Sequence, residues 1–472
     1  MRVVSWLPLS EKARLSMSES SDEREYLRAA QLAYEEISVR MGEGAPAPRL
    51  EPTRRVVELL GDVHRSYPVI QVAGTNGKTS TSRMIEAILR AYGLRTGLFT
   101  SPHLVTVNER IMIDGQPISN DAFVANWLDI KPYVTMVDAE LEKAGEPRLT
   151  YFEVLTILAF ACFADAPVDV AVVEVGLGGE WDSTNVADAV VAVFTPIDLD
   201  HTDRLGHTVR EIALTKSGII KPSALVVSAA QLPEVEEVLR NGAELSESEI
   251  AFLAGDRLSA SSRVAVGGQL ITVDGLAGNY SDIFLNLYGA HQSQNAALAI
   301  VAVESFLGGG TQYLDPEVIA EAFATVESPG RLHLVATEPT VLVDAAHNPH
   351  GAASLATALG EFFTFDDITV VVGTLGDKDS QGIIEALVPV ASRFIVVPVN
   401  SERASDASAV AALASAAAPA VTVDQAADLA EGIARARAYA SSTQKGAVVV
   451  TGSIVLVGQA LQLANLSEGW TK

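Results

Sequence analysis

The segment Val69–Ser80 constrains this chain more than any other, because it joins an apolar run to a loop of the kind that binds phosphate. The run Val69-Ile-Gln-Val-Ala73 is typical of a buried strand, and the loop Gly74-Thr-Asn-Gly77 leads into Lys78 and a helical pattern. Glycines let backbone N–H groups approach an anion, and a helix N-terminus adds a positive dipole. The lysine supplies a charge for phosphates, and a neighbouring hydroxyl can ligate Mg²⁺. The segment therefore predicts a nucleotide site.

The loop departs from the general P-loop pattern at its first position. Val72 stands where that pattern has a glycine, so only the shorter form Gly-Thr-Asn-Gly-Lys-Thr remains. A glycine-rich turn without a ligand is the alternative interpretation, but the strand before it and the helix after it favour a nucleotide. The residues predicted to hold the nucleotide here are Gly74, Thr75, Asn76, Gly77, Lys78, Thr79, Ser80 and Thr81.

Length and charge exclude several classes of protein. A chain of 472 residues is too long for one hydrophobic core, so we expect at least two domains. The formal net charge of −26 argues against nucleic-acid binding, which needs a basic surface. No apolar stretch reaches the length of a membrane span, about 18 residues, and Pro8 interrupts the apolar N-terminal run. We therefore expect a cytoplasmic protein with no membrane or nucleic-acid partner.

Residue patterns along the chain predict an α/β fold. From Val69 onward, short β-branched runs alternate with longer amphipathic stretches, which is typical of a mainly parallel sheet covered by helices. The expected strands are 69–73, 95–100, 169–175, 189–197 and 224–230, and the expected helices are 22–41, 80–92, 120–144, 151–164, 208–219, 233–242 and 291–307. Brief alternating segments with Gly and Asp turns between 252 and 286 predict a small antiparallel sheet.

A second α/β unit is predicted beyond Ser328-Pro-Gly330, which we expect to act as a hinge. Its expected strands lie near 340–344, 368–373, 393–398, 420–423 and 446–451. The pattern is Rossmann-like, but no GxGxxG follows the first strand, so no dinucleotide site is expected there. The predicted division is a disordered N-terminus at 1–20, an ATP-binding P-loop domain at 21–327 and a C-terminal domain at 328–472.

Two acidic or polar segments follow strands of the first unit. Glu174 ends an apolar run and precedes Gly176-Leu-Gly-Gly179, and a carboxylate among apolar neighbours needs a partner such as a metal cation. His201 lies among Asp198, Asp200 and Asp203 after another strand, at the end where open α/β sheets bind their ligands. We interpret Glu174 and His201 as metal ligands, against the alternatives of an edge-strand carboxylate and a structural histidine.

Lys216 and the segment 341–349 add two further candidates. Lys216 has largely apolar neighbours, and burial would lower its pKa and expose it to modification. A surface lysine is the alternative, and the residues by themselves favour it. Asp344, His347 and Asn348 form a compact polar cluster directly after a predicted strand, with Arg331 upstream near the hinge. This cluster is predicted to face the P-loop across a cleft between the two units.

These motifs occur in one order along the chain: two glycine segments, His201, Lys216 and Asp344-Ala-Ala-His-Asn-Pro349. In this order the chain resembles the folylpolyglutamate synthases, and more broadly the ATP-dependent Mur-type ligases, from about residue 24 to 460. The run Glu174-Val-Gly-Leu-Gly-Gly179 with Asp182 is specific for the folate branch, whereas the P-loop and His-Asn-Pro are shared with Mur ligases.

The resemblance implies a fold and a reaction. It implies a P-loop NTPase-like domain of the Mur ligase central type and a C-terminal Rossmann-like glutamate-ligase domain. The acceptor carboxylate takes the γ-phosphoryl group of ATP, and the amino group of L-glutamate then displaces phosphate to form an amide. The expected acceptors are dihydropteroate and folates, the expected cofactors are ATP and Mg²⁺ in two sites, and the expected state is a monomer.

The resemblance also implies roles for individual residues. It implies triphosphate binding by Lys78 to Thr81, ATP contacts by Asn295, Arg331 and Asp344, and magnesium binding by Ser101, Glu174 and His201. Lys216 matches a lysine that the family carbamylates, so we expect a catalytic set of Lys78, Glu174, His201 and Lys216. His347 and Ser453 match the glutamate site, and the pteroate pocket matches Thr150, Tyr151, Phe152, Glu153, Trp181, Asp182 and Ser183.

Two positions depart from the family pattern, and two other functions stay open. Thr79 follows the lysine where many folate ligases have glycine, and Glu180-Trp181 replaces Arg-x before Asp182. The first alternative is a Mur-type ligase acting on a peptidoglycan precursor, which would need a nucleotide-sugar-binding domain before the P-loop. The second is a P-loop regulatory protein without ligase activity, which would need no acceptor pocket.

Overall fold

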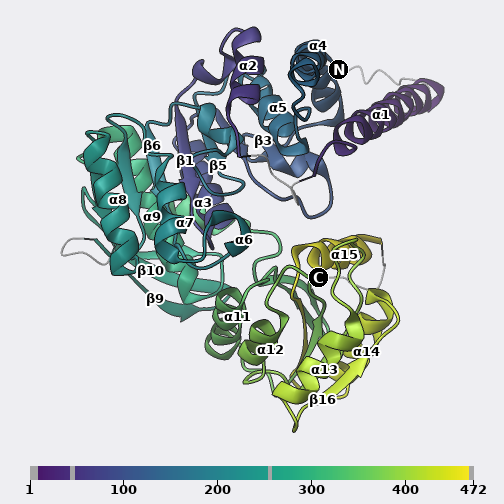
Figure 1. Cartoon of the computed structure of the whole chain (residues 1–472). Helices are drawn as coiled ribbons and strands as arrows, with labels where there is room; N and C mark the ends of the chain where they lie inside the picture. The colour runs from purple at the N-terminus through teal and green to yellow at the C-terminus, as the bar shows by residue number, and fades with distance from the viewer. Residues whose placement is uncertain (1–8, 43–47, 254–257, 467–472) are drawn as a thin grey trace, which may run out of the picture.

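The computed structural model describes residues 9–42, 48–253 and 258–466. The chain forms two α/β lobes (Figure 1), which confirms the predicted fold class. We call the elements up to α10 the N-terminal lobe and those from β12 onward the C-terminal lobe. Within the described residues, no helix combines the length and apolar character needed to cross a bilayer.

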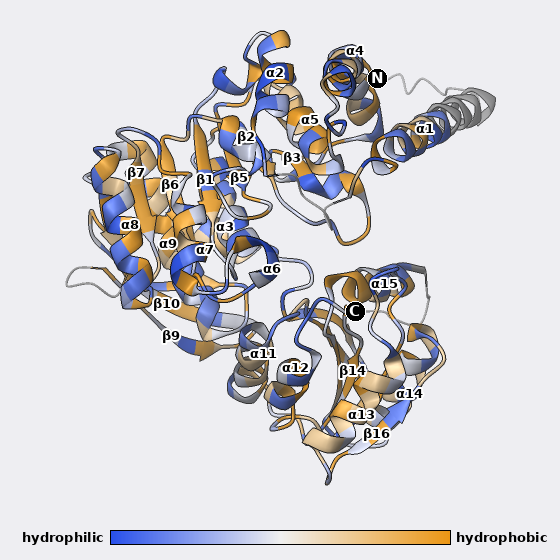
Figure 2. Cartoon of the chain, viewed as in Figure 1, coloured by the Kyte–Doolittle hydropathy of each residue, from blue (hydrophilic) through white to orange (hydrophobic). Residues whose placement is uncertain are grey.

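The N-terminal lobe is built on an eight-stranded sheet with the order β4-β3-β2-β5-β1-β6-β7-β8. Its strands are β1 (Val69–Ala73), β2 (Thr96–Phe99), β3 (Ile111–Ile113), β4 (Gln116–Pro117), β5 (Val170–Glu174), β6 (Val191–Phe194), β7 (Leu225–Ser228) and β8 (Glu249–Phe252). In that order, the pairs from β2 to β8 are parallel, and at one edge β3 pairs antiparallel with both β2 and β4. The central strands β1 and β5 are buried throughout, as expected for parallel strands covered on both faces. Figure 2 shows β1 coloured largely as hydrophobic.

Helices cover both faces of this sheet because successive side chains of a strand point in opposite directions. In β1, Ile70 and Val72 pack into the same cluster as α3 and α9, whereas Val69 packs with α4 and α5. The helices of the lobe are α1 (Leu9–Ser38), α2 (Glu51–Leu59), α3 (Lys78–Ala91), α4 (Asn120–Ala144), α5 (Tyr151–Asp165), α6 (Thr202–Leu205), α7 (Val209–Ser217), α8 (Pro233–Leu245), α9 (Ala290–Gly308) and α10 (Pro316–Thr325), with 3₁₀ turns η1 (Val63–Arg65), η2 (Val107–Arg110) and η3 (Ser183–Val186).

A small antiparallel sheet covers the outer side of α9, as the Gly and Asp turns predicted. It consists of β9 (Ser259–Ala265), β10 (Gly268–Asp274) and β11 (Asn279–Leu285). The turn between β10 and β11 is held by Glu304 of α9, whose carboxylate accepts hydrogen bonds from Tyr280 Oη and from the backbone N–H groups of Leu276 and Ala277. This buried carboxylate is fully satisfied by groups that lie away from the P-loop.

The C-terminal lobe contains a six-stranded sheet with the order β12-β13-β17-β14-β15-β16. All pairs are parallel except β12 with β13. The strands are β12 (His333–Thr337), β13 (Thr340–Val343), β14 (Asp367–Val372), β15 (Arg393–Val396), β16 (Thr422–Gln425) and β17 (Gly446–Thr451). The helices are α11 (Pro349–Phe362), α12 (Ser380–Leu387), α13 (Ala407–Ala417), α14 (Leu429–Ser441) and α15 (Ile454–Leu466).

Several elements differ from the sequence expectation. Helix α1 begins at Leu9 rather than near Asp22, so it extends into the segment predicted to be disordered, while residues 1–8 lie outside the described residues. The short elements β3, β4, β8 and β12 and the helices α2, α6 and α10 had no predicted counterpart. They are short or lie at sheet edges, where hydrophobic periodicity is weakest. The predicted boundary at 327/328 stays a prediction.

Candidate active site

A single large cavity of about 830 Å³ lies between the two lobes. Strands of both sheets end at it with their carboxyl ends, which is where open α/β sheets bind ligands. The N-terminal lobe contributes the P-loop and the loops after β2, β5 and β6, and the C-terminal lobe contributes the loops after β13, β14 and β17. Of the predicted site residues, those that line the cavity are Gly74 to Ser80, Ser101, Thr150, Phe152, Glu153, Glu174, Trp181, Asp182, Ser183, His201, Lys216, Asn295, Arg331, Asp344, His347 and Ser453.

Two predicted residues do not reach this cavity. Thr81 is fully buried in the first turn of α3, and Tyr151 is buried against Tyr34 and the Arg110 guanidinium, 5.4 Å from the Tyr151 ring centre. Both follow a residue that does line the cavity. On a helix, adjacent positions point in different directions, so a run of neighbouring residues cannot all face one ligand.

The P-loop connects β1 to α3 and its shape depends on two glycines. Gly74 and Gly77 have φ of +148° and +89°, and a Cβ on Gly77 would lie 2.6 Å from Asn295 Oδ1. A Cβ on Gly74 would collide with the Thr195 side chain. Lys78 Nζ donates to the carbonyl oxygens of Gly74 and Thr75, at 3.1 Å each, and burial lowers the pKa of Lys78. The loop thus presents a lysine and the N-terminus of α3 to the cavity.

Glu174 ends β5 beside the P-loop and is 2% exposed. Its carboxylate oxygens accept the hydroxyl of Thr79 at 3.0 and 3.1 Å, and one accepts the N–H of Ser101 at 3.4 Å. Burial raises the pKa of Glu174, while Lys78 opposes that shift. The edge-strand interpretation is wrong, because β5 is a central strand between β1 and β2.

Lys216 is buried on α7 with 4% of its surface exposed, so the preference for a surface lysine was wrong. Its Nζ donates to Gly74 O at 2.8 Å, across from the lysine of the P-loop. Burial lowers the pKa of Lys216 to about 7, and the nearby Lys78 acts in the same direction. At neutral pH a large part of this amine is therefore uncharged, which is the form that reacts with electrophiles.

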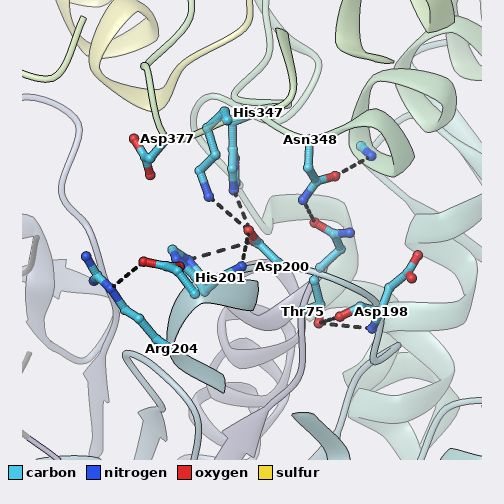
Figure 3. Close-up of polar contacts among 12 residues, drawn as sticks. Thr75, Asp198, Asp200, His201, Arg204, His347, Asn348 and Asp377 are labelled. Carbon is cyan, nitrogen blue, oxygen red and sulfur yellow. Dashed lines mark hydrogen bonds and ion pairs between the residues drawn. The ribbon is translucent and has the colours of Figure 1, made fainter. Parts of the chain in front are cut away.

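The loop after β6 carries Asp200 and His201 toward the C-terminal lobe (Figure 3). Asp200 accepts a hydrogen bond from Lys378 Nζ at 2.9 Å and lies 3.8 Å from the Nε2 atoms of both His201 and His347. Burial would raise the pKa of Asp200, but His347, His201 and Lys378 outweigh it and hold that pKa below its ordinary value. Burial also lowers the pKa of His201 to about 4, so this ring is neutral at physiological pH.

The C-terminal lobe presents the predicted polar cluster after β13. Asp344 accepts the N–H groups of Leu332 and Ala346 at 2.7 and 2.8 Å. Burial raises the pKa of Asp344, and the positive charge of Arg331 lowers it. Asn348 caps α11 by accepting the N–H of Gly351, and its amide donates to Asn76 of the P-loop at 3.2 Å. The cluster therefore faces the P-loop, as predicted.

The predicted pteroate residues divide into two groups. Phe152 lies 5.8 Å from the ring of Phe99 and so close to Gly176 that a Cβ there would collide with it, so its ring closes one wall of the cavity. Trp181 is 45% exposed at the rim. Glu153 instead caps its own helix through the Thr150 N–H and pairs with Arg49 at 3.1 Å, and Asp182 caps the turn at Leu177 and Thr184. These two carboxylates are occupied by the protein itself.

Some cavity residues had no sequence prediction: Arg49, Asp200, Arg204, His291, His350, Lys378 and Arg403. Lys378 follows strand β14, so the rule that selected His201 could have selected it too. Arg49 follows the proline-bearing segment of which residues 43–47 lie outside the described residues, and nothing in its local pattern marks it. Within the described residues, no group of three or more His, Cys, Asp or Glu side chains is arranged to hold a metal ion by itself.

Known proteins match this chain over most of its length. The Mur ligase middle domain matches residues 72–303, and the Mur ligase glutamate ligase domain matches residues 330–454. A dihydrofolate synthase/folylpolyglutamate synthase of Mycobacterium tuberculosis is 46% identical over 380 residues, or 78% of each chain. The structure of Mycobacterium tuberculosis folylpolyglutamate synthase complexed with ADP has a TM-score of 0.89 at 42% identity and covers 94% of this chain and 99% of its own. Escherichia coli FolC in complex with DHPP and ADP has a TM-score of 0.80 at 29% identity, covering 92% and 97%.

Proposed function

Since the chain belongs to the Mur ligase family, in its folylpolyglutamate and dihydrofolate synthase branch, we propose that it adds L-glutamate both to dihydropteroate and to folates. It is an ATP-dependent glutamate ligase of folate metabolism. The double activity is supported by the name of the Mycobacterium tuberculosis relative, which joins both synthases. The alternative of a peptidoglycan-precursor ligase is not favoured, because the folate branch matches along 78% of the chain.

One observation supports the reaction most strongly: the P-loop of one lobe and Asp344 and His347 of the other line the same cavity. A ligase of this kind must bring a carboxylate acceptor, a triphosphate and an amine together, and holding reactants in one site greatly accelerates a reaction between them. We assign the phosphates to the residues of the P-loop and to Asn295, Arg331 and Asp344. We assign the glutamate to His347 and Ser453 and the acceptor to the wall formed by Phe152 and Trp181.

The residues beside the P-loop fit a magnesium ion. Glu174 is a buried carboxylate whose neighbours on the cavity side are the Thr79 hydroxyl and the Ser101 loop, and Mg²⁺ prefers a carboxylate, hydroxyl oxygens, water and substrate phosphates. The absence of a three-residue acidic or histidine cluster in the described chain suits such a site, since phosphates complete it. Glu174, Thr79 and Ser101 would hold one ion, and His201 would belong to the second. The ions would neutralise phosphate charge.

Lys216 supports a further assignment, the carbamylation of its amine. The ammonium first loses one proton, and the neutral amine then attacks CO₂ and releases a second proton, so a carbamate anion replaces a cation. A pKa of about 7, caused mainly by burial, leaves enough neutral amine for this step. The carbamate would then face the second metal position rather than Gly74 O.

The residues of this chain have distinct parts in catalysis. The acceptor carboxylate and the triphosphate are both negatively charged and repel each other. Lys78 and Arg331 offset this charge, so the carboxylate oxygen can attack the γ-phosphorus. Phe152 and the buried wall behind it limit the access of water, which would hydrolyse the acyl phosphate. His347 and Ser453 orient the glutamate so that its neutral amine attacks the acyl carbon and phosphate departs.

The test is a steady-state assay of phosphate release with dihydropteroate and with tetrahydrofolate in parallel. We expect phosphate release only when glutamate and an acceptor are both present, and products one glutamate heavier by mass spectrometry. Turnover of ATP that ignores both substrates would favour the P-loop regulatory protein instead. Glutamate ligation with only one of the two acceptors would rule out the proposed double activity. A monomeric state and a cytoplasmic location stay predictions.

A further inference from the structure

Polar contacts between the two lobes gather near the P-loop. Asn348 donates to Asn76 at 3.2 Å, and the Asn76 amide lies 3.0 Å from His350 Nδ1. Among the described residues, the Lys–Asp or Lys–Glu ion pair between the lobes is Lys378–Asp200, at 2.9 Å, whose side chains are 10% and 13% exposed. None of the assigned substrate roles uses this ion pair.

Each partner of the pair is fixed firmly to its own lobe. Lys378 lies in the loop after β14, where its N–H donates to Leu375 O and the preceding Gly376 N–H donates to Arg403 O at 2.7 Å. Asp200 lies in the loop after β6, which Thr75 of the P-loop holds by donating to Asp198 O and accepting the Asp198 N–H, at 3.0 Å each. Because each loop is tied to its own lobe by these hydrogen bonds, we expect the contact to form only over a narrow range of lobe separations.

The pair also connects two residues with assigned roles. The carboxylate of Asp200 lies 3.8 Å from Nε2 of His201 in its own lobe and 3.8 Å from Nε2 of His347 in the other lobe. Figure 3 shows these groups converging on Asp200 from both sides. A buried charge that loses its partner is strongly unfavourable, so such a pair specifies geometry more than it adds net stability.

We propose that Asp200 and Lys378 are positioning residues that hold the C-terminal lobe at the separation needed for amide formation. In this closed arrangement the pair keeps His347 and Ser453 opposite the P-loop, without touching ATP. The proposal rests on the proposed function, because it concerns the step in which glutamate meets the activated acceptor. A displacement of about 1 Å can lower a reaction rate on the order of a hundredfold.

The first measurement is the distance between the lobes. Spin labels on Asn241→Cys in α8 and Ser441→Cys in α14 report it, and the native Cys162 is buried and takes no label. We expect one narrow distance distribution in the parent and a longer or broader one in Lys378→Gln. The matched control is Arg40→Gln, which breaks an ion pair of similar burial inside the N-terminal lobe, Arg40–Asp138 at 2.7 Å, and should leave the distance unchanged.

The second measurement separates positioning from simple loss of stability. We expect Lys378→Gln and Asp200→Asn each to lower kcat for glutamate ligation about tenfold to a hundredfold, with unchanged ATP affinity. The double variant should lose little more than either single variant, since both remove one interaction. Lys378→Arg should recover most of the rate. Thermal unfolding identifies any variant that does not fold, and the remaining single variant then carries the test.

Two results would overturn the proposal. One is an unchanged distance distribution together with unchanged kcat in Lys378→Gln. The other is a raised KM for glutamate in Lys378→Gln that Asp200→Asn does not reproduce, which would mean that Lys378 contacts the substrate directly. Failure of the proposed function would give a different result, because the parent protein itself would show no glutamate-dependent phosphate release. The distance measurement would still test whether the ion pair sets the separation of the lobes.

Discussion

The two walls of the cavity differ in how their charged groups are held. On the N-terminal wall, Glu174 and Lys216 are 2% and 4% exposed and are fixed by contacts with the P-loop and its neighbouring strands. On the C-terminal wall Lys378 is only 10% exposed, but the side chains of His347 and Arg403 are 30% and 53% exposed and extend from loops. Most of the phosphate half of the site is therefore built at the end of one sheet, with Asp344 added from the second lobe, whereas the glutamate half depends on where the second lobe lies.

This difference predicts two classes of variant. A preorganised site stabilises charge without rearranging during the reaction, so changes on the N-terminal wall should lower the rate of every step that involves ATP. Changes at the glutamate residues of the C-terminal wall, His347 and Ser453, should affect glutamate and leave ATP affinity intact, whereas Asp344 of that wall belongs with the ATP residues. A variant of His347 or Ser453 that weakened ATP as much as an N-terminal one would remove the distinction.

The largest effect is expected for Glu174→Gln. The substitution keeps the shape but removes the charge that the metal assignment requires, and we expect phosphate release to fall about a thousandfold. Because burial raises the pKa of Glu174, a neutral side chain there should not lower the free energy of unfolding. The assay is glutamate-dependent phosphate release with thermal unfolding measured on the same preparation.

Glu304→Gln is the matched control for this variant, since Glu304 is a buried carboxylate that lies outside the cavity. It holds the β10–β11 turn through two backbone N–H groups, so we expect a lower melting temperature with unchanged kcat. Near-full activity of Glu174→Gln would rule out its assigned role. Equal losses in both variants would indicate a general effect of removing buried carboxylates.

The second largest effect concerns Lys216 and its pH dependence. Lys216→Met should lower the rate about a hundredfold if the carbamate orients a metal ligand. In the parent, burial lowers the pKa of Lys216 to about 7, so the neutral amine and its carbamate increase as pH rises through 7. A ¹³C carbamate signal from labelled bicarbonate should follow that rise and be absent from Lys216→Met; a signal that persists in the variant contradicts the assignment.

The same shift has a consequence for stability. An unfolded lysine has a pKa near 10.4, so between about pH 7 and 10 the unfolded chain binds more protons at this position than the folded chain. The free energy of unfolding that depends on Lys216 should therefore increase with pH across this interval and reach its low plateau below it. Lys216→Met should lack this dependence, which denaturant titrations at several pH values would detect.

The third effect is steric, and two glycines with similar backbones isolate it. Gly77 and Gly93 have φ of +89° and +81°, at the two ends of α3, but a Cβ would lie 2.6 Å from Asn295 Oδ1 only at Gly77. Both alanine variants should lose similar stability from the strained φ. Gly77→Ala should in addition weaken ATP about tenfold, because the P-loop must shift. Equal ATP affinities, measured by calorimetry, would contradict the proposed close fit.

The sequence predicted the strand ends well because they depend on local pattern. β1 and β5 are buried apolar runs that stop at a glycine loop and at Glu174, and periodicity and turn residues make such positions visible. The burial of Lys216 was not visible in this way. Its helix packs on α8, so its environment depends on residues that are distant in sequence.

Contacts between the lobes were beyond a local argument altogether. Asp200 and Lys378 are 178 positions apart, and no spacing rule links two loops on separate sheets. Glu153 shows a different difficulty, and its substrate role stays a prediction. Its place in the motif suggested a substrate contact, yet the capping box with Thr150 and the ion pair with Arg49 account for its carboxylate. The same sequence pattern can arise from a helix cap or from a substrate site, so the pattern alone does not distinguish them.

The smallest effect is expected on the C-terminal wall, at Ser453. This hydroxyl is 1% exposed, follows β17 and accepts the N–H of Val455 at 3.2 Å while lining the cavity. Removing one neutral hydrogen bond to a substrate weakens binding about threefold to tenfold, so Ser453→Ala should raise KM for glutamate by that factor with unchanged ATP affinity. The control is Ser392→Ala, because Ser392 also accepts a backbone N–H at 3.2 Å, from Ile368, but lies outside the cavity. Ser392 is exposed, so its variant should lose less stability than Ser453→Ala, and only Ser453→Ala should change KM. If both variants changed KM for glutamate, the cause would be the stability of the C-terminal lobe rather than a contact between Ser453 and glutamate. The two walls would then differ only in how rigidly their side chains are held.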